Sequence, residues 1–153
     1  MKKLICFDMD GTIADLYAVD NWLNKLRASD PSPYAEAEPM WDMTKLVNAL
    51  NTLRQNEYEV VVITWLSKES TAEYDKAVRE AKQEWLNSYN FPCDYFHGVK
   101  YGTTKASTIR KYMNAYEKAY LFDDNAQIRK GWHLGEAIDP TCEDIVEFLE
   151  NLL

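Results

Sequence analysis

The sequence contains few of the residues that build covalent frameworks and soft metal sites. It has three cysteines, Cys6, Cys93 and Cys142, with no CxxC pair, and only two histidines. An odd number of unclustered cysteines argues against a disulfide framework and against a cysteine-histidine zinc site. We therefore expect a protein of a reducing compartment, most simply the cytoplasm.

The chain also lacks long apolar runs. Lys2 and Lys3 precede an apolar segment, as in a secretory signal, but Asp8 interrupts that segment after four residues. No other stretch approaches the roughly 20 apolar residues of a transmembrane helix. We expect no membrane association.

Basic residues are in deficit. The 153 residues include 17 Lys and Arg against 25 Asp and Glu, for a formal net charge of −8. This balance argues against binding of extended nucleic acid or of an anionic membrane surface, although it allows a local basic pocket. The length and the 46% hydrophobic content are those of one domain, spanning 1–153, with a sizeable core.

Short apolar or β-branched runs alternate with stretches of helical period. This alternation predicts an α/β fold: a Rossmann-like three-layer sandwich around a parallel sheet of about five strands. The expected strands are Leu4–Phe7, Glu59–Thr64, Asp94–His97, Ala119–Asp124 and Gly135–Asp139.

Three stretches between and after these strands have the apolar spacing of core-facing helices. The stripes run from Met43 to Leu53 and from Tyr74 to Trp85, with charged residues expected on the opposite faces. A last helix is expected to start at Thr141, as in a capping box. Residues 16–41 interrupt the alternation with an amphipathic piece and a proline-bearing stretch, and they predict a small cap-like insertion after the first strand.

Polar residues follow the predicted strands. In open α/β sheets the ligand site lies beyond the carboxyl ends of the strands, so these residues should share one rim. They are Asp8, Asp10, Thr64, Lys105, Asp123 and Asp124. Two carboxylates as close as Asp8 and Asp10 repel unless a cation or a shared proton offsets them.

The order DMDGT, a strand ending in Thr64, a helix-start Lys105 and the pair Asp123–Asp124 resembles the haloacid dehalogenase-like (HAD) hydrolases over nearly the whole chain. The resemblance implies a Mg²⁺-dependent phosphomonoester hydrolase that acts through an aspartyl-phosphate. Carboxylates without a histidine or cysteine cluster suit Mg²⁺, a hard cation that prefers oxygen ligands.

The same resemblance implies the role of each aspartate. Asp8 would be the nucleophile, and Asp10 would be the general acid to the leaving oxygen and then the general base to water. An Asp8 oxygen, the Asp10 main-chain carbonyl and Asp124 would bind Mg²⁺, with Asp123 supporting them from outside direct contact. Which of Asp123 and Asp124 binds directly is left open by the sequence.

Phosphate binding is expected from Thr64, Lys105, Gly11 and Thr12, which offer hydroxyl, ammonium and backbone donors. Lys100 competes with Lys105 for the role of the phosphate-binding lysine.

Trp65 directly follows Thr64, and we expect it either to line the substrate entrance or to pack under the insertion. The insertion would determine the leaving group. A small phosphorylated metabolite is expected, with a nucleotide preferred because the short insertion looks similar to that of 5′(3′)-deoxyribonucleotidases and phage-type members.

Two other functions stay open: a phospho-acceptor regulatory domain and a non-catalytic binding module on the same fold. In a receiver domain the acceptor aspartate ends the third strand after an acidic pair on the first. Here the acidic pair comes late in the chain. A small cap also leaves open a homo-oligomer in which a neighbouring subunit covers the site.

Overall fold

A five-stranded parallel sheet forms the centre of the computed structural model, which describes all residues 1–153. Its spatial order is β5-β4-β1-β6-β7, and every neighbouring pair is parallel. The strands are β1 (Lys2–Phe7), β4 (Tyr58–Trp65), β5 (Tyr95–Val99), β6 (Tyr116–Phe122) and β7 (Ala137–Ile138). The predicted α/β fold and its five strands are confirmed, with end points that differ by a few residues.

The centre of the sheet is buried on both faces, which explains why β4, β1 and β6 contain continuous apolar runs rather than alternating ones. Along β1, Ile5 and Phe7 enter the larger core cluster on one face, whereas Leu4 and Cys6 enter a second cluster on the other. All four side chains are fully buried. Burial on this scale contributes roughly 25 cal/mol for each Å² of apolar surface.

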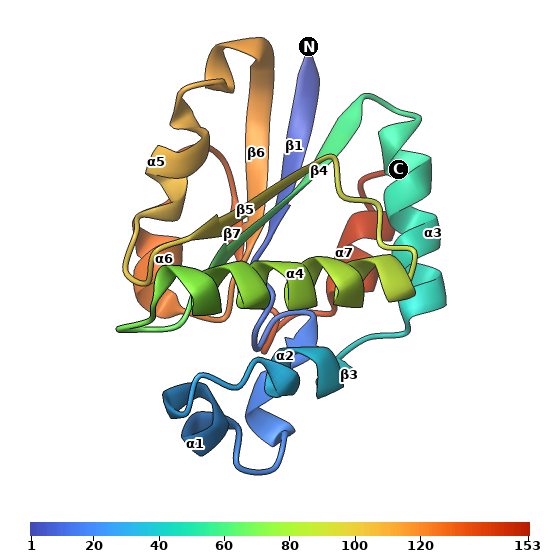
Figure 1. The fold of residues 1–153 in the computed structure, drawn as a ribbon. Helices are drawn as coiled ribbons and strands as arrows, with labels where there is room; N and C mark the ends of the chain where they lie inside the picture. Colours follow the sequence, from blue (N-terminus) through green and yellow to red (C-terminus); the bar gives the residue numbers. More distant parts are fainter.

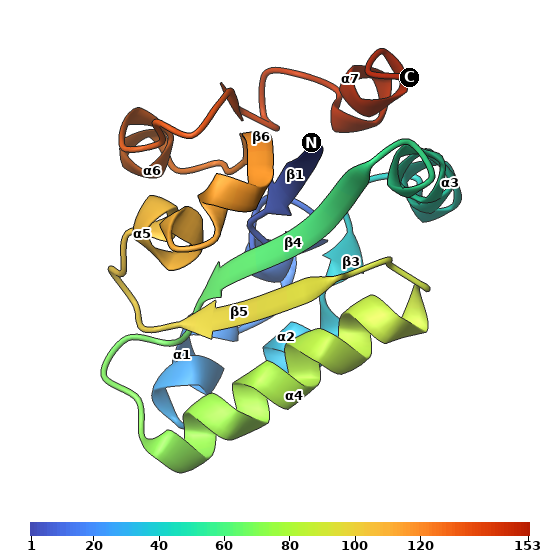
Figure 2. The ribbon, with the colours of Figure 1, turned by 90° about the horizontal axis from the view of Figure 1, so that it is seen from above.

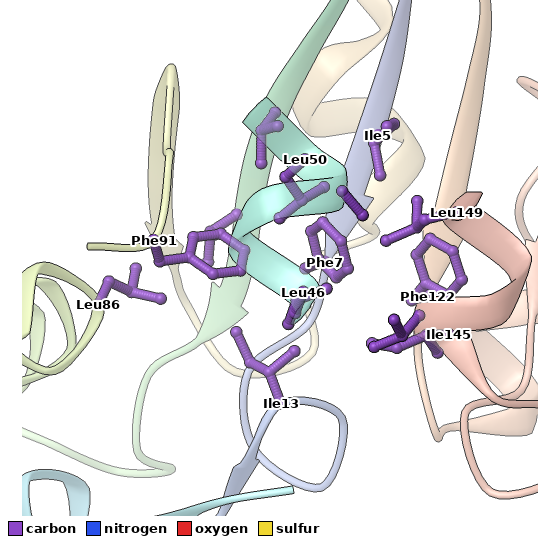
Figure 3. Packing of buried hydrophobic residues seen from close by; sticks show 14 of the residues in the cluster. Ile5, Phe7, Ile13, Leu46, Leu50, Leu86, Phe91, Phe122, Ile145 and Leu149 are labelled. Atoms are coloured by element: carbon purple, nitrogen blue, oxygen red, sulfur yellow. The ribbon is translucent and has the colours of Figure 1, made fainter. Parts of the chain in front are cut away.

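Helices cover both faces, so the fold has three layers (Figures 1 and 2). Side chains of α3, α4 and α7 pack in the larger cluster, where Phe7 lies between Phe91 and Phe122 (Figure 3). Side chains of α5 and α6 pack on the opposite face. The bounds are α3 (Met43–Arg54), α4 (Ala72–Ser88), α5 (Lys105–Arg110), α6 (Ala126–Lys130) and α7 (Ile145–Glu150).

The insertion after β1 lies beyond the carboxyl ends of the strands (Figure 1). It packs on the sheet domain through an apolar cluster in which Leu16 and Tyr34 meet Leu66, Tyr74 and Val78. Its elements are a two-stranded ribbon of β2 (Ala14–Asp15) and β3 (Glu38–Pro39), the 3₁₀ turn η1 (Leu16–Ala18), and the helices α1 (Trp22–Arg27) and α2 (Ser32–Glu36). A second 3₁₀ turn, η2 (Met113–Ala115), precedes β6.

One helix prediction needs correction. The last helix starts at Ile145 rather than near Thr141, because the Asp144 carboxylate accepts hydrogen bonds from the N–H groups of Val146 and Glu147 and so caps it. The amphipathic piece after residue 16 forms the separate elements η1 and α1, because Asn21 between them adopts a left-handed conformation with φ 58°. None of the helices is long and apolar enough to cross a bilayer.

Candidate active site

A cavity of about 840 Å³ lies where the carboxyl ends of the strands meet the insertion. Asp8, Asp10, Lys105, Asp123 and Asp124 all border it, so three different segments of the chain contribute carboxylates or an ammonium to one site. The insertion, residues 65–69 after β4, Tyr101 and the start of α6 form its remaining walls. This is the rim at which ligands bind in open α/β sheets.

Asp8 follows the last residue of β1 and is held by donors on both of its oxygens. Lys105 Nζ donates to Oδ1 at 2.9 Å, and the Thr12 hydroxyl donates to Oδ2 at 3.1 Å. The backbone N–H of Asp8 continues the sheet by donating to Phe122 O. The Asp8 carboxylate is therefore fixed in orientation at the edge of the cavity, as a nucleophile has to be.

Asp8, Asp123 and Asp124 bring carboxylate oxygens within 4.8 Å of one another. Burial and the negative charge of Asp8 raise the pKa of Asp123 to about 6 and that of Asp124 to about 7. Asp123 is paired with Lys105, whereas Asp124 makes no ion pair with any lysine or arginine. Such crowding of like charges calls for an additional cation.

Gly11 permits this crowding. It adopts φ 80°, and a Cβ at this position would overlap the Asp124 carboxylate. A residue with a side chain would thus push Asp124 away from Asp8 as well as strain the backbone.

Lys105, the first residue of α5, is the lysine that reaches Asp8 and Asp123. Its side chain is buried, and its Nζ donates to Asp8 at 2.9 Å and to Asp123 at 2.6 Å. These attractions outweigh burial and raise the pKa of Lys105 above its ordinary value. Lys100, its rival in the sequence, is exposed and does not border the cavity.

The N–H and hydroxyl groups of Gly11 and Thr12, which were predicted to bind phosphate, donate to other groups of the protein. The N–H of Gly11 donates to Ala14 O, and the N–H of Thr12 donates to Met9 O, so both groups close the turn after β1. The Thr12 hydroxyl donates to Asp8. We therefore assign Gly11 and Thr12 to shaping the turn and orienting Asp8 rather than to binding phosphate.

Asp10 and Thr64 lie next to each other, and a residue absent from the predicted site joins them. Lys82 on α4 donates from Nζ to Asp10 Oδ2 at 3.0 Å and to Thr64 Oγ1 at 2.5 Å. Burial raises the pKa of Asp10 above its usual range, and the charge of Lys82 opposes that shift. Thr64, predicted to bind phosphate, is fully buried and does not border the cavity, and its hydroxyl accepts from Lys82.

The expectation that all charged residues of α4 lie opposite its apolar stripe is wrong at Lys82. This lysine lies four residues after Val78 and three before Trp85, and all three are buried. A charged residue at a core position of a helical stripe is the signal that could have found it.

Trp65 borders the cavity and packs away from the insertion. Its ring lies 4.8 Å from that of Tyr101, and its indole N–H donates to Thr103 O. On the insertion side, the rings of Tyr17 and Trp22 form a second aromatic pair at 5.0 Å. Both pairs belong to the cavity lining.

Comparison with known proteins assigns this arrangement to a known fold. No protein-family model and no curated protein matches the sequence. Among solved structures, the chain is similar to the HAD domain of the effector protein Lem4 from Legionella pneumophila, with a TM-score of 0.52, 14% identity, and coverage of 99% of this chain and 94% of that one. A Mesorhizobium loti protein assigned as a HAD-like phosphatase gives a TM-score of 0.55 and 15% identity over 85% and 66% of the two chains.

The chain has the fold of the HAD-like phosphatases. A chain of the Pnkp1/Rnl/Hen1 RNA repair complex shares it with a TM-score of 0.60 and 17% identity over 91% of this chain, which spans 42% of that longer one. Identities this low support a shared HAD fold and leave substrate and activity to be argued from the site.

Proposed function

We propose that this protein is a Mg²⁺-dependent phosphomonoester hydrolase that forms an aspartyl-phosphate on Asp8. The observation that carries the proposal is the convergence of Asp8, Asp123, Asp124 and Lys105 at the edge of one cavity. The HAD fold supports the same reaction class.

The carboxylate cluster fits Mg²⁺. The oxygen donors within 4.8 Å of one another suit a hard cation, and the pKa of Asp124 is raised by burial and by the charge of Asp8, which a cation would offset. Asp8 and Asp123 each accept hydrogen bonds on both oxygens, whereas Asp124 accepts from no lysine. Asp124 would therefore hold the ion directly, with the nucleophile Asp8 beside it. When bound, Mg²⁺ would neutralise charge on the phosphoryl group.

The residues of the chain then have distinct tasks. An Asp8 oxygen attacks phosphorus, the bond from phosphorus to the leaving oxygen breaks, and Asp10 gives its proton to that oxygen. Water next attacks the aspartyl-phosphate, and Asp10 takes a proton from the water, so Asp8 and inorganic phosphate are regenerated. The raised pKa of Asp10 suits a group that alternates between acid and base.

Lys105 would bind a phosphoryl oxygen. Lys105 Nζ makes two hydrogen bonds to protein, so its third N–H is available to the ligand. Thr64 is fully buried and does not border the cavity, so its hydroxyl serves as an acceptor for Lys82 and not as a donor to the ligand. A fixed donor such as Lys105 supplies part of the electrostatic stabilisation on which phosphoryl transfer depends.

Within this class we favour a nucleoside monophosphate as substrate. The pairs Trp65–Tyr101 and Tyr17–Trp22 give the cavity aromatic walls from two separate parts of the chain. Aromatic rings of this kind stack well on a nucleobase.

The test is a panel of phosphorylated metabolites and p-nitrophenyl phosphate, assayed with Mg²⁺ and with EDTA. We expect multiple turnovers that need Mg²⁺, and loss of more than about 10⁴-fold in Asp8→Asn because the nucleophile is removed. A single phosphorylation event without turnover would instead indicate a phospho-acceptor domain. No reaction with any phosphoester would indicate a binding module.

A further inference from the structure

Lys82 is a fully buried lysine that has no role in the reaction as described so far. Its side chain is 1% exposed and lies on the core side of α4, in the middle of the helix. Burying an ammonium group is unfavourable unless acceptors replace its lost water. Here those acceptors all come from the candidate active site.

The ammonium group has three N–H donors and three acceptors. Nζ donates to Asp10 Oδ2 at 3.0 Å, to Thr64 Oγ1 at 2.5 Å and to Trp65 O at 3.0 Å. The Tyr34 ring of the insertion lies 4.7 Å away, over the same group. Because every N–H is used, Lys82 has none left for a phosphoryl group, and it does not border the cavity.

One of these bonds constrains a group that the reaction uses. Oδ2 of Asp10 is held by Lys82, whereas Oδ1 has no hydrogen-bond donor in the protein, and Asp10 borders the cavity. The hydrogen bond therefore fixes one carboxyl oxygen and leaves the other free. The bonds to Thr64 Oγ1 and Trp65 O hold Lys82 itself in place.

We propose that Lys82 is a positioning residue that holds the Asp10 carboxyl group in place to protonate the leaving oxygen. This role rests on the proposed phosphatase function. It predicts that loss of Lys82 matters most when the leaving group needs a proton.

The test compares two substrates of similar shape. The nitrophenolate of p-nitrophenyl phosphate departs readily, whereas the phenolate of phenyl phosphate is more basic and depends on general acid catalysis. For Lys82→Met we expect kcat/KM on phenyl phosphate to fall about 10- to 100-fold, which is part of the usual contribution of general acid catalysis. The fold-loss in kcat/KM on p-nitrophenyl phosphate should be about tenfold smaller. Any loss that the two substrates share cancels in that ratio.

The matched control is Lys76→Met, an exposed lysine of the same helix, which should retain parental kinetics on both substrates. Circular dichroism and thermal melting establish that each variant is folded at the assay temperature. If Lys82→Met is unfolded, Lys82→Gln takes its place, because the amide keeps two N–H donors.

A double-mutant cycle tests whether Lys82 acts through Asp10. In an Asp10→Asn background, Lys82→Met should cause no further loss on phenyl phosphate, because the group that it positions no longer transfers a proton. Equal losses on the two substrates, or an independent loss in the cycle, would overturn the positioning role. An inactive parent protein would overturn the proposed function itself, and the positioning role with it.

Discussion

Lys82 and Lys105 are both buried lysines bound to active-site aspartates, yet the structure uses them differently. Lys105 makes two hydrogen bonds to carboxylates and borders the cavity. Lys82 makes three, with one to a main-chain carbonyl, and does not border it. The number of N–H groups left over therefore separates a lysine that can bind a ligand from one that holds other side chains.

The largest effect that tests this comparison is expected from Lys105→Met. Loss of the ammonium leaves Asp8 and Asp123 without their cation and removes a donor to the phosphoryl group. We expect kcat/KM to fall about 10²- to 10³-fold, as for the removal of a fixed donor to a developing charge. Inhibition by inorganic phosphate should weaken in parallel.

Two other variants sharpen this measurement. Lys82→Met should keep the inhibition constant for phosphate, because Lys82 has no N–H for the ligand, and Lys100→Met should match the parent because Lys100 is exposed. If phosphate inhibition weakened as much in Lys82→Met as in Lys105→Met, the two lysines would not differ in the way that their hydrogen bonds indicate.

The two lysines also show what the sequence could predict. Lys105 follows a predicted strand and a loop, at the start of a helix, and parallel strands bring such positions to one rim. Lys82 lies 18 residues after Thr64 inside a helix, where position along the chain gives no sign of the active site. Only its place in the buried stripe marked it as unusual.

The sheet was predictable for a related reason. Its three central strands, β4, β1 and β6, are buried on both faces, so each contains a short apolar run such as EVVVIT, residues 59–64, that stands out from the helices around it. The insertion was predicted as a unit but not in detail. Its short helices depend on single residues, such as Asn21 in a left-handed conformation, and on packing against α4.

The second-largest effect is expected at Asp124, the carboxylate of the cluster that makes no ion pair with a lysine. Its pKa of about 7 means that a proton competes with Mg²⁺ for the site below neutral pH. We expect the apparent affinity for Mg²⁺ to fall by up to about tenfold for each pH unit below 7. Calorimetric titration at pH 5.5, 6.5 and 8 measures this, and an affinity that did not vary with pH would contradict it.

The stability of the Mg²⁺-free protein should rise as pH falls, whereas the affinity for Mg²⁺ should fall. A carboxyl group whose pKa is raised by folding binds more protons in the native state, so it destabilises the native state as pH rises from about 4 to about 7. The Tm in EDTA should therefore fall more over this window in the parent than in Asp124→Asn. Added Mg²⁺ should raise the Tm of the parent more at pH 8 than at pH 5.

The smallest expected effect concerns the aromatic wall beside Lys105. Tyr101 is 56% exposed and pairs with Trp65, so Tyr101→Ala removes stacking surface without disturbing the core. If the wall holds a nucleobase, KM for a nucleoside monophosphate should rise about 2- to 10-fold, and KM for glycerol phosphate should not change. Tyr95→Ala is the matched control, because Tyr95 is also exposed but does not border the cavity. An equal change in KM for both substrates would show that Tyr101 does not contact the leaving group, and the preference for nucleotides would then have no support from this side of the cavity.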